Sequence, residues 1–360
     1  MKKLGVKKVA LMLALIMVVA MFAGCGTPAE QESSQAPSQT SEETSSAPES
    51  TEPAAEQGGT DTYKGGGQGR ALNELTVGFA QMENNMSWRI AETNSIKEEA
   101  AARGVNLIYT DAQSNTAKQV SDVEDMVAQG VDYIVLPPRE EEGMTPALEA
   151  AKQAGIPVIL VDRGVKGTAG EDYATLICSD FIYEGEEIAK WIVEKTGGKG
   201  NIVILEGTQG ATATMDRQEG FMNIIEGTDM KVIADQTADF TMSDAQAAME
   251  NIIQAHGDEI DVVYCHNDDM ALGAIQAMKS AGLKPGEDII VAGSDGSKAA
   301  LEAIIAGEMS VTIQCNPFFG PVVFDTIEKL EAGEEIPTFI KNEDVLFDIT
   351  NAEENLSLGF

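Results

Sequence analysis

The chain has 360 residues and a formal net charge of −35, from 24 Lys and Arg against 59 Asp and Glu. This balance excludes a nucleic-acid-binding protein, because neutralising phosphates requires a basic surface. It is typical of a soluble protein whose surface repels other copies of itself, and we therefore expect a monomer.

Residues 1–24 predict a secretory signal peptide. Lysines within the first eight residues precede an uninterrupted apolar run over residues 9–22, and the small residues Ala23 and Gly24 lead to Cys25. This is the pattern of a secretory signal, and its ending resembles a bacterial lipobox. The resemblance implies cleavage before Cys25 and lipidation of its thiol, which would hold the protein on the extracytoplasmic face of the membrane. The alternative is a transmembrane anchor, for which the apolar run is short.

Residues 25–73 predict the lipidated Cys25 followed by a disordered tether. The segment is rich in Ser, Thr, Pro, Glu, Gln and Gly and has almost no large apolar residues. Such a composition cannot bury enough surface to offset the entropy lost on ordering. The glycine run at 65–67 follows no strand, so it is not interpreted as a phosphate-binding loop.

From residue 74 onward, short apolar strands alternate with helices that end at a glycine. The first half predicts strands at 75–80, 105–109, 133–136 and 157–161, with helices at 88–103, 117–129 and 144–154. The second half predicts strands at 174–178, 202–205, 231–234, 262–265, 289–292 and 311–314, with helices at 184–195, 216–225, 243–254, 269–281, 299–306 and 321–331. This alternation indicates an α/β protein with parallel sheets covered on both faces. The elements are too numerous for one typical sheet, so we expect two similar doubly wound lobes.

Polar side chains gather where these strands end, and ligands of such sheets bind at the carboxyl ends of the strands. The segments are 81–89, 111–113, 138–140, 162–163, 208–217, 239–240, 266–269, 294–296 and Gln314. Carboxylates, amides and guanidinium groups hydrogen-bond to hydroxyls, and aromatic rings stack on the apolar face of a sugar. The mixture therefore favours a carbohydrate ligand.

Five motifs carry a resemblance to a known family. They are Val-Asp-Arg at 161–163, Ala-Asp-Phe at 238–240, Asn-Asp-Asp-Met-Ala-Leu-Gly-Ala at 267–274, Gly-Ser-Asp-Gly at 293–296 and Thr-Ile-Gln at 312–314. With these motifs in order, residues 75–360 resemble the type I periplasmic sugar-binding proteins of ABC transporters, in the ribose/galactose-binding group. Stretches 87–94, 210–217 and 266–277 are most similar to galactofuranose-binding proteins.

The resemblance implies a set of ligand-binding residues. It places Trp88 and Arg89 over the sugar, Asp162 and Arg163 on the first lobe, Arg217, Phe240, Asn267 and Asp295 on the second lobe, and Gln314 near the hinge. Gln113 lies near a position where relatives carry an amide. Arg139 replaces the small or acidic residue common at its loop, and it leaves the identity of the sugar open.

Simpler interpretations of several site residues remain open. Trp88 could pack as a hydrophobic staple, and Phe240 could belong to the core. Asn267 could cap a helix, Asp295 could serve only a turn, and the neighbours at 162–163 could form a structural ion pair.

The resemblance also implies the domain organisation. The N-terminal lobe is expected to contain 74–178 plus 315–344, and the C-terminal lobe 179–314 plus 345–360. Three chain crossings, near 178–180, 314–316 and 344–346, would form the hinge.

The function implied is a lipid-anchored, extracytoplasmic solute-binding protein without a cofactor. It would capture a galactofuranose- or galactose-like monosaccharide, or another pentose or hexose, by hinge closure and deliver it to an ABC permease. One alternative is a sensor that presents the closed state to a membrane receptor or kinase. Another is a sugar-processing enzyme with Asp162 and Asp295 as paired carboxylates, although Arg163 and Arg217 would keep such acids ionised.

The remaining cysteines and His266 carry no strong signal of chemistry. Cys178, Cys265 and Cys315 match no zinc spacing and are interpreted as small buried hydrophobic residues. A disulfide between Cys178 and Cys315 is the alternative. A metal site at His266 is disfavoured, because adjacent residues at a strand end point in different directions.

Overall fold

The computed structural model describes residues 62–360. The predicted signal peptide, Cys25 and the tether up to residue 61 lie outside these residues. Within the described part of the chain, no helix is long and apolar enough to cross a membrane.

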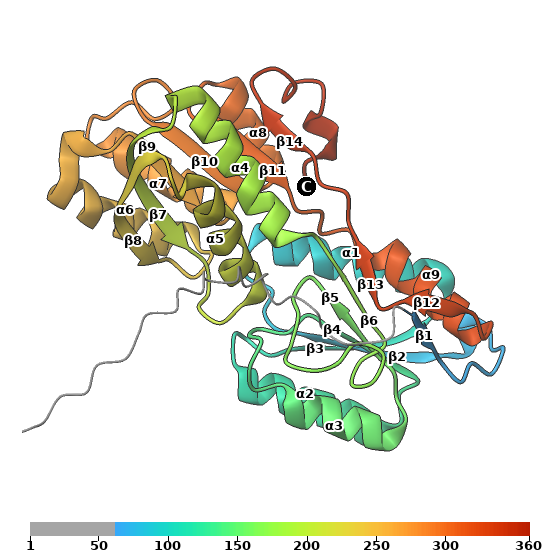
Figure 1. Cartoon of the computed structure of the whole chain (residues 1–360). Helices are drawn as coiled ribbons and strands as arrows, with labels where there is room; N and C mark the ends of the chain where they lie inside the picture. Colours follow the sequence, from blue (N-terminus) through green and yellow to red (C-terminus); the bar gives the residue numbers. More distant parts are fainter. Residues whose placement is uncertain (1–61) are drawn as a thin grey trace, which may run out of the picture. The chain divides into compact units, whose positions relative to one another are not determined.

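The N-terminal lobe is built on a six-stranded parallel sheet (Figure 1). Its strands are β2 (Thr76–Gln81), β3 (Asn106–Asp111), β4 (Tyr133–Leu136), β5 (Val158–Val161), β6 (Thr175–Cys178) and β13 (Phe339–Lys341), in the order β13-β6-β5-β4-β2-β3. Helices α1 (Ser87–Arg103) and α9 (Gly320–Glu331) cover one face, and α2 (Thr116–Gln129) and α3 (Thr145–Ala154) cover the other.

Side chains of β2 alternate between the two cores of this lobe. Val77 and Phe79 enter the cluster on the α1 side, whereas Ala80 enters the cluster on the α2 side. Gly78 also faces α2, where an added Cβ would lie 2.5 Å from the sulfur of Met126. Glycine therefore lets α2 pack close to the sheet.

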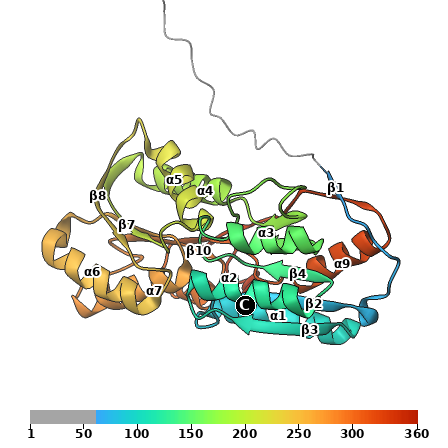
Figure 2. The ribbon, with the colours of Figure 1, turned by 90° about the horizontal axis from the view of Figure 1, so that it is seen from below.

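The C-terminal lobe repeats this architecture with one reversed edge strand. Its strands are β7 (Lys199–Glu206), β8 (Asp229–Thr237), β9 (Val262–Cys265), β10 (Ile290–Asp295), β11 (Val311–Gln314) and β14 (Leu346–Asp348), in the order β14-β11-β10-β9-β7-β8. Only β14 runs antiparallel to its neighbour. Helices α4 (Phe181–Thr196) and α5 (Thr212–Ile225) cover one face. The other face carries α6 (Met242–His256), α7 (Asp268–Ser280) and α8 (Lys298–Ile305), and Figure 2 shows α6 beside α7.

The chain passes between the sheets three times. It leaves the first sheet after β6, returns after β11 to add β13, and passes back to add β14. These crossings form the hinge between the lobes. The predicted fold class, two doubly wound α/β lobes joined by three crossings, is confirmed, and the predicted glycine stops of α1, α2 and α3 are left-handed C-caps.

The prediction that the disordered tether extends to residue 73 is wrong for residues 62–73. Strand β1 (Thr62–Lys64) pairs antiparallel with β12 (Glu335–Pro337), and a short 3-10 helix covers Leu72–Glu74. Arg70 forms ion pairs with Asp132 and, at 2.8 Å, with Glu331. We call residues 62–70 the strap. Its order comes from distant partners, Asp132 at a separation of 62 residues and the others more than 260 residues away, which local composition does not reveal.

All three cysteines in the described residues are buried and free. The alternative of a disulfide between Cys178 and Cys315 is therefore wrong, and the interpretation as small buried side chains is confirmed. Two further 3-10 helices, Gly257–Glu259 and Leu356–Leu358, complete the secondary structure of the described chain.

Candidate functional site

A cavity of about 30 Å³ lies where the carboxyl ends of strands from both lobes face each other. Its lining is Met86, Trp88, Arg89, Asp162, Arg163, Ala213, Arg217, Phe240, Asn267, Asp295 and Cys315. Eight of the eleven residues predicted to bind ligand are among them. None of those eight is more than 6% exposed, so the two lobes enclose them. We call this site the cleft.

Three predicted residues lie outside the cavity lining. Gln113 is exposed, and its backbone N–H donates to Asp111. Arg139 pairs through its side chain with Glu140, and only its backbone carbonyl approaches the cleft, where it accepts from Arg163 Nη1 at 2.9 Å. Gln314 lies at the hinge, where its backbone N–H donates to Val345 at 2.8 Å.

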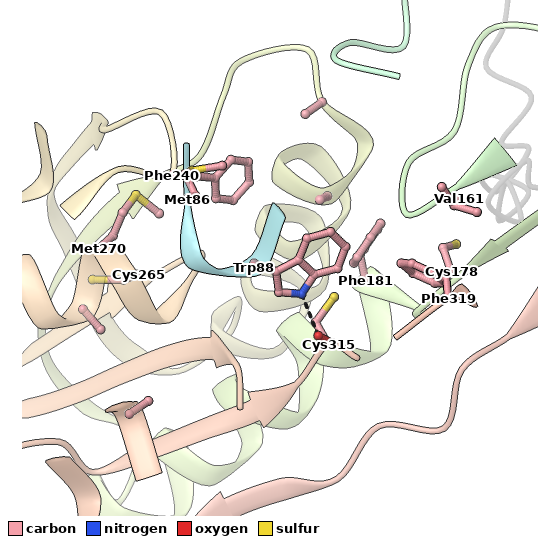
Figure 3. Close-up of a cluster of buried hydrophobic side chains, with 14 of the residues drawn as sticks. Met86, Trp88, Val161, Cys178, Phe181, Phe240, Cys265, Met270, Cys315 and Phe319 are labelled. Atoms are coloured by element: carbon pink, nitrogen blue, oxygen red, sulfur yellow. Dashed lines mark hydrogen bonds between the residues drawn. The ribbon is translucent and has the colours of Figure 1, made fainter. Parts of the chain in front are cut away.

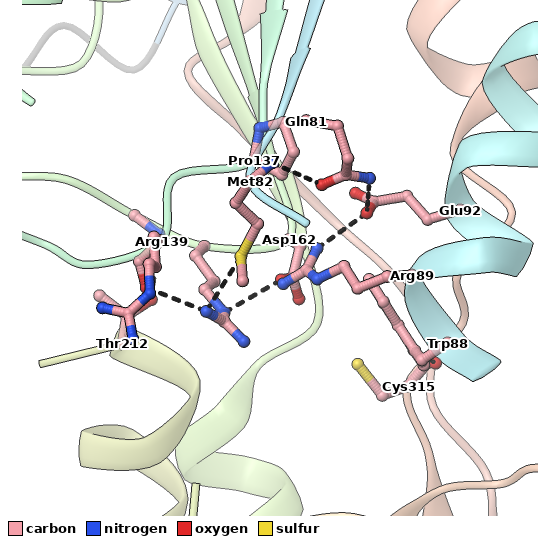
Figure 4. A network of polar contacts seen from close by, with 12 residues as sticks. Gln81, Met82, Trp88, Arg89, Glu92, Pro137, Arg139, Asp162, Thr212 and Cys315 are labelled. Atoms are coloured by element: carbon pink, nitrogen blue, oxygen red, sulfur yellow. Dashed lines mark hydrogen bonds and ion pairs between the residues drawn. The ribbon is translucent and has the colours of Figure 1, made fainter. Parts of the chain in front are cut away.

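Charge pairing dominates the wall of the cleft on the N-terminal lobe. Arg89 lies between Glu92 and Asp162 (Figure 4) and pairs with both, at 2.8 Å in the case of Glu92. Arg163 Nε lies 3.3 Å from the same Asp162 carboxylate. Burial, together with the charge of Arg89, lowers the pKa of Arg163 to about 10, so both arginines remain charged near neutral pH.

Trp88 joins the cleft to the hinge. Its indole N–H donates to the carbonyl of Cys315 at 2.7 Å, as Figure 3 shows. Its ring meets Phe319 edge to face at 6.0 Å between ring centroids, and the guanidinium of Arg89 lies 4.7 Å from the ring centroid. Trp88 therefore packs against the second crossing and lines the cleft at the same time.

The wall on the C-terminal lobe is organised around Arg217. Its Nε donates to Glu184 at 2.6 Å, and its Nη1 donates to the carbonyl of His266 at 2.7 Å. Its Nη2 lies 3.9 Å from Asp295. Burial raises the pKa of Asp295 well above its ordinary range, and the charge of Asp268 adds to the rise.

His266 has a structural role behind this wall. Its Nδ1 accepts from the backbone N–H of Gly207 at 3.4 Å, which assigns the proton to Nε2, 3.1 Å from the side-chain oxygen of Gln218. Burial lowers the pKa of His266 to about 3, and the charge of Arg217 contributes. The imidazole is therefore neutral. Among residues 62–360, no three His, Cys, Asp or Glu side chains are grouped so that they could hold a metal ion.

Asn267 and Phe240 hold each other in place. Asn267 Oδ1 accepts from the backbone N–H of Met270, capping α7, and its Nδ2 donates to the carbonyl of Phe240 at 3.1 Å. The ring of Phe240 lies over Gly207, where an added Cβ would come within 2.0 Å of it. The opposite lobe supplies Arg163, whose guanidinium is 5.1 Å from the centroid of this ring.

Backbone strain accompanies three of the cleft residues. Asp162, Phe240 and Asp295 have φ values of 65°, 61° and 129°, in a region that side chains other than glycine rarely occupy. Each such conformation costs about 1–3 kcal/mol and persists only where surrounding contacts enforce it. All three residues line the cavity, so this rare backbone conformation coincides with side chains that face the cleft.

Sequence reasoning missed three lining residues and two supporting ones. Met86 and Ala213 lie inside two of the predicted segments and Cys315 directly follows Gln314, but none of the three carries a group that indicates binding. Glu92 and Glu184 are fully buried behind the arginines. Glu92 follows Arg89 by three residues on α1, a spacing that the sequence already contains, whereas Glu184 on α4 meets Arg217 of α5 only once the two helices are packed.

The cleft therefore combines guanidinium donors, carboxylate acceptors, an amide and two aromatic rings, a set suited to a ligand rich in hydroxyls. The model of the periplasmic binding protein domain family matches residues 77–334. This chain belongs to that family. Its matched region spans both lobes of the periplasmic binding protein and the first two crossings between them.

Proteins that are similar to this chain are named as sugar-binding proteins. The chain is 41% identical over 267 residues to the galactofuranose-binding protein YtfQ of Escherichia coli (strain K12), covering 73% of this chain and 84% of that protein. A crystal structure of a galactofuranose binding protein aligns with a TM-score of 0.77 at 40% identity, covering 79% of this chain and 97% of the other.

A third relative is the binding protein of the arabinose ABC transporter from Shewanella sp. ANA-3, solved with α- and β-L-arabinofuranose. It aligns with a TM-score of 0.76 at 38% identity and covers 78% of this chain and 94% of the other. All three relatives are named as binding proteins, and the third is named as a component of an ABC transporter. Their family supports a location on the extracytoplasmic side of the membrane.

Proposed function

We propose that this protein captures a monosaccharide of the galactofuranose or galactose type between its lobes and delivers it to an ABC permease. The observation that carries the proposal is the cleft itself, in which both lobes direct buried arginine, carboxylate and aromatic side chains at one small cavity. The names of the relatives support a sugar ligand, and all three that are described above support a furanose ring.

In this proposal, hydroxyl groups of the sugar take up the hydrogen-bonding capacity that the cleft offers. Asp162 and Asp295 accept hydrogen bonds from hydroxyls, whereas Arg89, Arg163 and Arg217 donate to ring and hydroxyl oxygens. Each such bond contributes about 0.5–1.5 kcal/mol net, or more where the partner is charged. The selection of one sugar is therefore a matter of a few hydroxyl positions.

Capture requires the lobes to separate and close again. The cavity has room for about two water molecules, which is smaller than a monosaccharide. Contacts between the lobes surround it, including Ser87 to Asp269 at 3.0 Å and Gly164 N–H to Thr212 at 3.0 Å. A sugar that bridges the two walls would favour closure by its better binding to the closed state.

The lipid anchor and the permease belong to the same proposal. A lipidated Cys25 would hold the protein at the outer membrane surface, and the segment between Cys25 and the strap would let it reach the permease. A mature protein isolated from its host membrane should carry a lipid-modified N-terminal cysteine, detectable by mass spectrometry. An unmodified Cys25 in that preparation would remove the anchor and leave the sugar-binding role in place.

Calorimetric titration tests the ligand directly. The domain from Thr62 onward, unfolded and refolded to remove carried-over ligand, would be titrated with galactose, arabinose, ribose, glucose and a galactofuranose source. We expect one-to-one binding of one of these sugars, lost in Asp162→Ala and Arg163→Ala and retained in Arg139→Ala, whose side chain pairs with Glu140 outside the cavity lining. A folded domain that binds none of them would contradict the proposal.

A further inference from the structure

Each lobe holds one of its cleft arginines from behind with a fully buried glutamate. On the N-terminal lobe, Glu92 follows Arg89 by three residues on α1, so the pair forms within one helix. On the C-terminal lobe the two partners come from different helices, with Glu184 on α4 and Arg217 on α5. The second arrangement exists only because the two helices approach each other closely.

Two glycines make that approach possible. An added Cβ on Gly185 would lie 2.2 Å from the carbonyl oxygen of Arg217, and one on Gly220 would lie 2.1 Å from that of Ile182. With any larger residue the helices would move apart. The backbone is thus arranged so that Glu184 reaches the guanidinium of Arg217, with 2.6 Å between Oε2 and Nε.

The contacts of Arg217 leave one edge of its guanidinium for the cleft. Glu184 holds Nε, and the carbonyl of His266 holds Nη1 at 2.7 Å. The remaining Nη2 lies 3.9 Å from Asp295, longer than a direct hydrogen bond. A ligand oxygen could therefore accept from this edge without displacing either of the other two contacts.

Glu184 also lies where the hinge crossings meet. It is in the first turn of α4, directly after the first crossing. At the second crossing, burial raises the pKa of the Cys315 thiol, and the charge of Glu184 is the next largest cause. At the third crossing, burial raises the pKa of Asp344, and the charge of Glu184 is the next largest cause.

We propose that Glu184 is a positioning residue that fixes the guanidinium of Arg217 in the orientation required for ligand capture. The inference rests on the proposed function, in which Arg217 contacts the sugar. Glu184 itself lies behind the arginine and contacts no ligand. Stability alone does not explain such a pair, because desolvation of two buried ions offsets much of their attraction and an apolar pair of similar volume is often as stable.

The first test measures the hydrogen bond between Arg217 and Glu184 in the absence of sugar. In a ¹⁵N-edited spectrum of arginine side chains, we expect the Nε proton of Arg217 to be shifted downfield and to exchange slowly. Arg89 Nε has no hydrogen-bond partner among the described residues, so its proton is the internal reference. In Glu184→Gln the Arg217 proton should exchange about tenfold faster, as expected for losing a charge-assisted hydrogen bond, whereas Glu92→Gln should leave it unchanged.

The second test measures coupling in sugar binding. Glu184→Gln should weaken affinity about tenfold in the wild-type background and should have no further effect in Arg217→Ala. Glu92→Gln is the matched control, because its partner is Arg89. Its effect should be the same in the wild-type and Arg217→Ala backgrounds. Additive effects of Glu184→Gln and Arg217→Ala would overturn the positioning role.

The two tests separate failure of this inference from failure of the proposed function. If the folded wild-type protein binds no sugar, the proposed function fails, and a positioning role in sugar capture fails with it even if the Arg217 proton is protected. If sugar binds but that proton exchanges as freely as the Arg89 proton, the positioning role is wrong and the proposed function stands. Should Glu184→Gln not fold, the wild-type spectrum alone still distinguishes a protected Arg217 proton from a free one.

Discussion

The two walls of the cleft use similar residues but balance their charges differently. On the N-terminal lobe, Arg89 and Arg163 both approach Asp162, and Arg89 also pairs with Glu92. On the C-terminal lobe, a single arginine, Arg217, faces Glu184 and Asp295, and the carboxyl of Asp268 lies buried behind them. The first wall is neutralised within itself, whereas the second has an excess of buried carboxyl groups.

This difference assigns different energetic roles to the walls. In the first, the carboxylate of Asp162 already has charged partners, so the wall is preorganised before a ligand arrives. In the second, no positively charged group of the described residues lies closer than 3.9 Å to Asp295, and burial raises its pKa well above the ordinary range. A hydrogen bond to a ligand hydroxyl should therefore stabilise Asp295 more than it stabilises Asp162. Neutralising one carboxyl in each wall should consequently change stability in opposite directions.

The largest effect is expected for Asp162→Asn, which removes the shared partner of Arg89 and Arg163. Arg163 then loses its ion-pair partner and Arg89 keeps only Glu92, and breaking such a buried pair costs about 3–5 kcal/mol of the free energy of unfolding. Urea denaturation of the sugar-free domain would measure it. A loss below about 1 kcal/mol would show that the first wall is not held together by this charge pairing.

The strap adds a further ion pair to the N-terminal lobe, between Arg70 and Glu331. Arg70→Ala leaves Glu331, which is 3% exposed, without the ion pair to Arg70, and the loss of such a partner costs about 1–3 kcal/mol. A domain that begins at Glu74 should lose at least as much relative to one that begins at Thr62. Equal denaturation midpoints for these two domains would mean that the strap adds nothing to stability.

Asp295→Asn should have the opposite sign from Asp162→Asn. Because the folded state raises the pKa of Asp295, the folded protein retains this proton to higher pH than the unfolded chain does, so the wild type loses stability as pH rises above the ordinary Asp range. The variant lacks that loss, and its advantage in Tm should be larger at pH 8 than at pH 5. Sugar affinity should fall in the same variant. A Tm below that of the wild type at pH 8 would contradict the charge excess of the second wall.

A smaller pH effect is expected at the hinge. Burial raises the pKa of Asp344 to about 8, and Glu184 adds to the rise, while Ser179, Arg217 and Lys341 oppose it. An unfolded Asp has a pKa near 3.9, so the stability associated with the bound proton is present at low pH and is lost between about pH 4 and 8. Asp344→Asn should reduce this loss, and Glu343→Gln, an exposed neighbour, should not. The measurement is the denaturation midpoint as a function of pH. Identical midpoints for Asp344→Asn and the wild type across this range would show that this hinge carboxyl does not contribute to the pH dependence of stability.

The pattern of apolar strands and glycine-terminated helices was sufficient to predict the doubly wound lobes. Strands β4, β9 and β11 begin and end where the pattern predicts. The first two are short runs of buried apolar side chains, whereas β11 alternates Val311 and Ile313 with polar residues. Strands β1, β12, β13 and β14 were not predicted. Each has three residues, and each exists through pairing with a distant segment rather than through local hydrophobicity.

The cleft was predictable wherever a motif lies directly at a strand end, as at Asp162, Asn267 and Asp295. Gln113 and Arg139 also follow strands, but Gln113 is exposed and the side chain of Arg139 pairs with Glu140, so neither lines the cavity. Glu184 could not be predicted as a cleft-supporting residue. Its role depends on the close packing of α4 and α5, which brings together residues 33 positions apart.

Hydrogen–deuterium exchange with and without a bound sugar tests most directly the central claim, that one sugar bridges both walls. The account predicts slower exchange on both lobes together, in the loops after β5 and β10 and in the first turns of α1 and α5, with the hinge crossings affected as well. Protection confined to one lobe, or found away from the cleft, would contradict capture between the lobes.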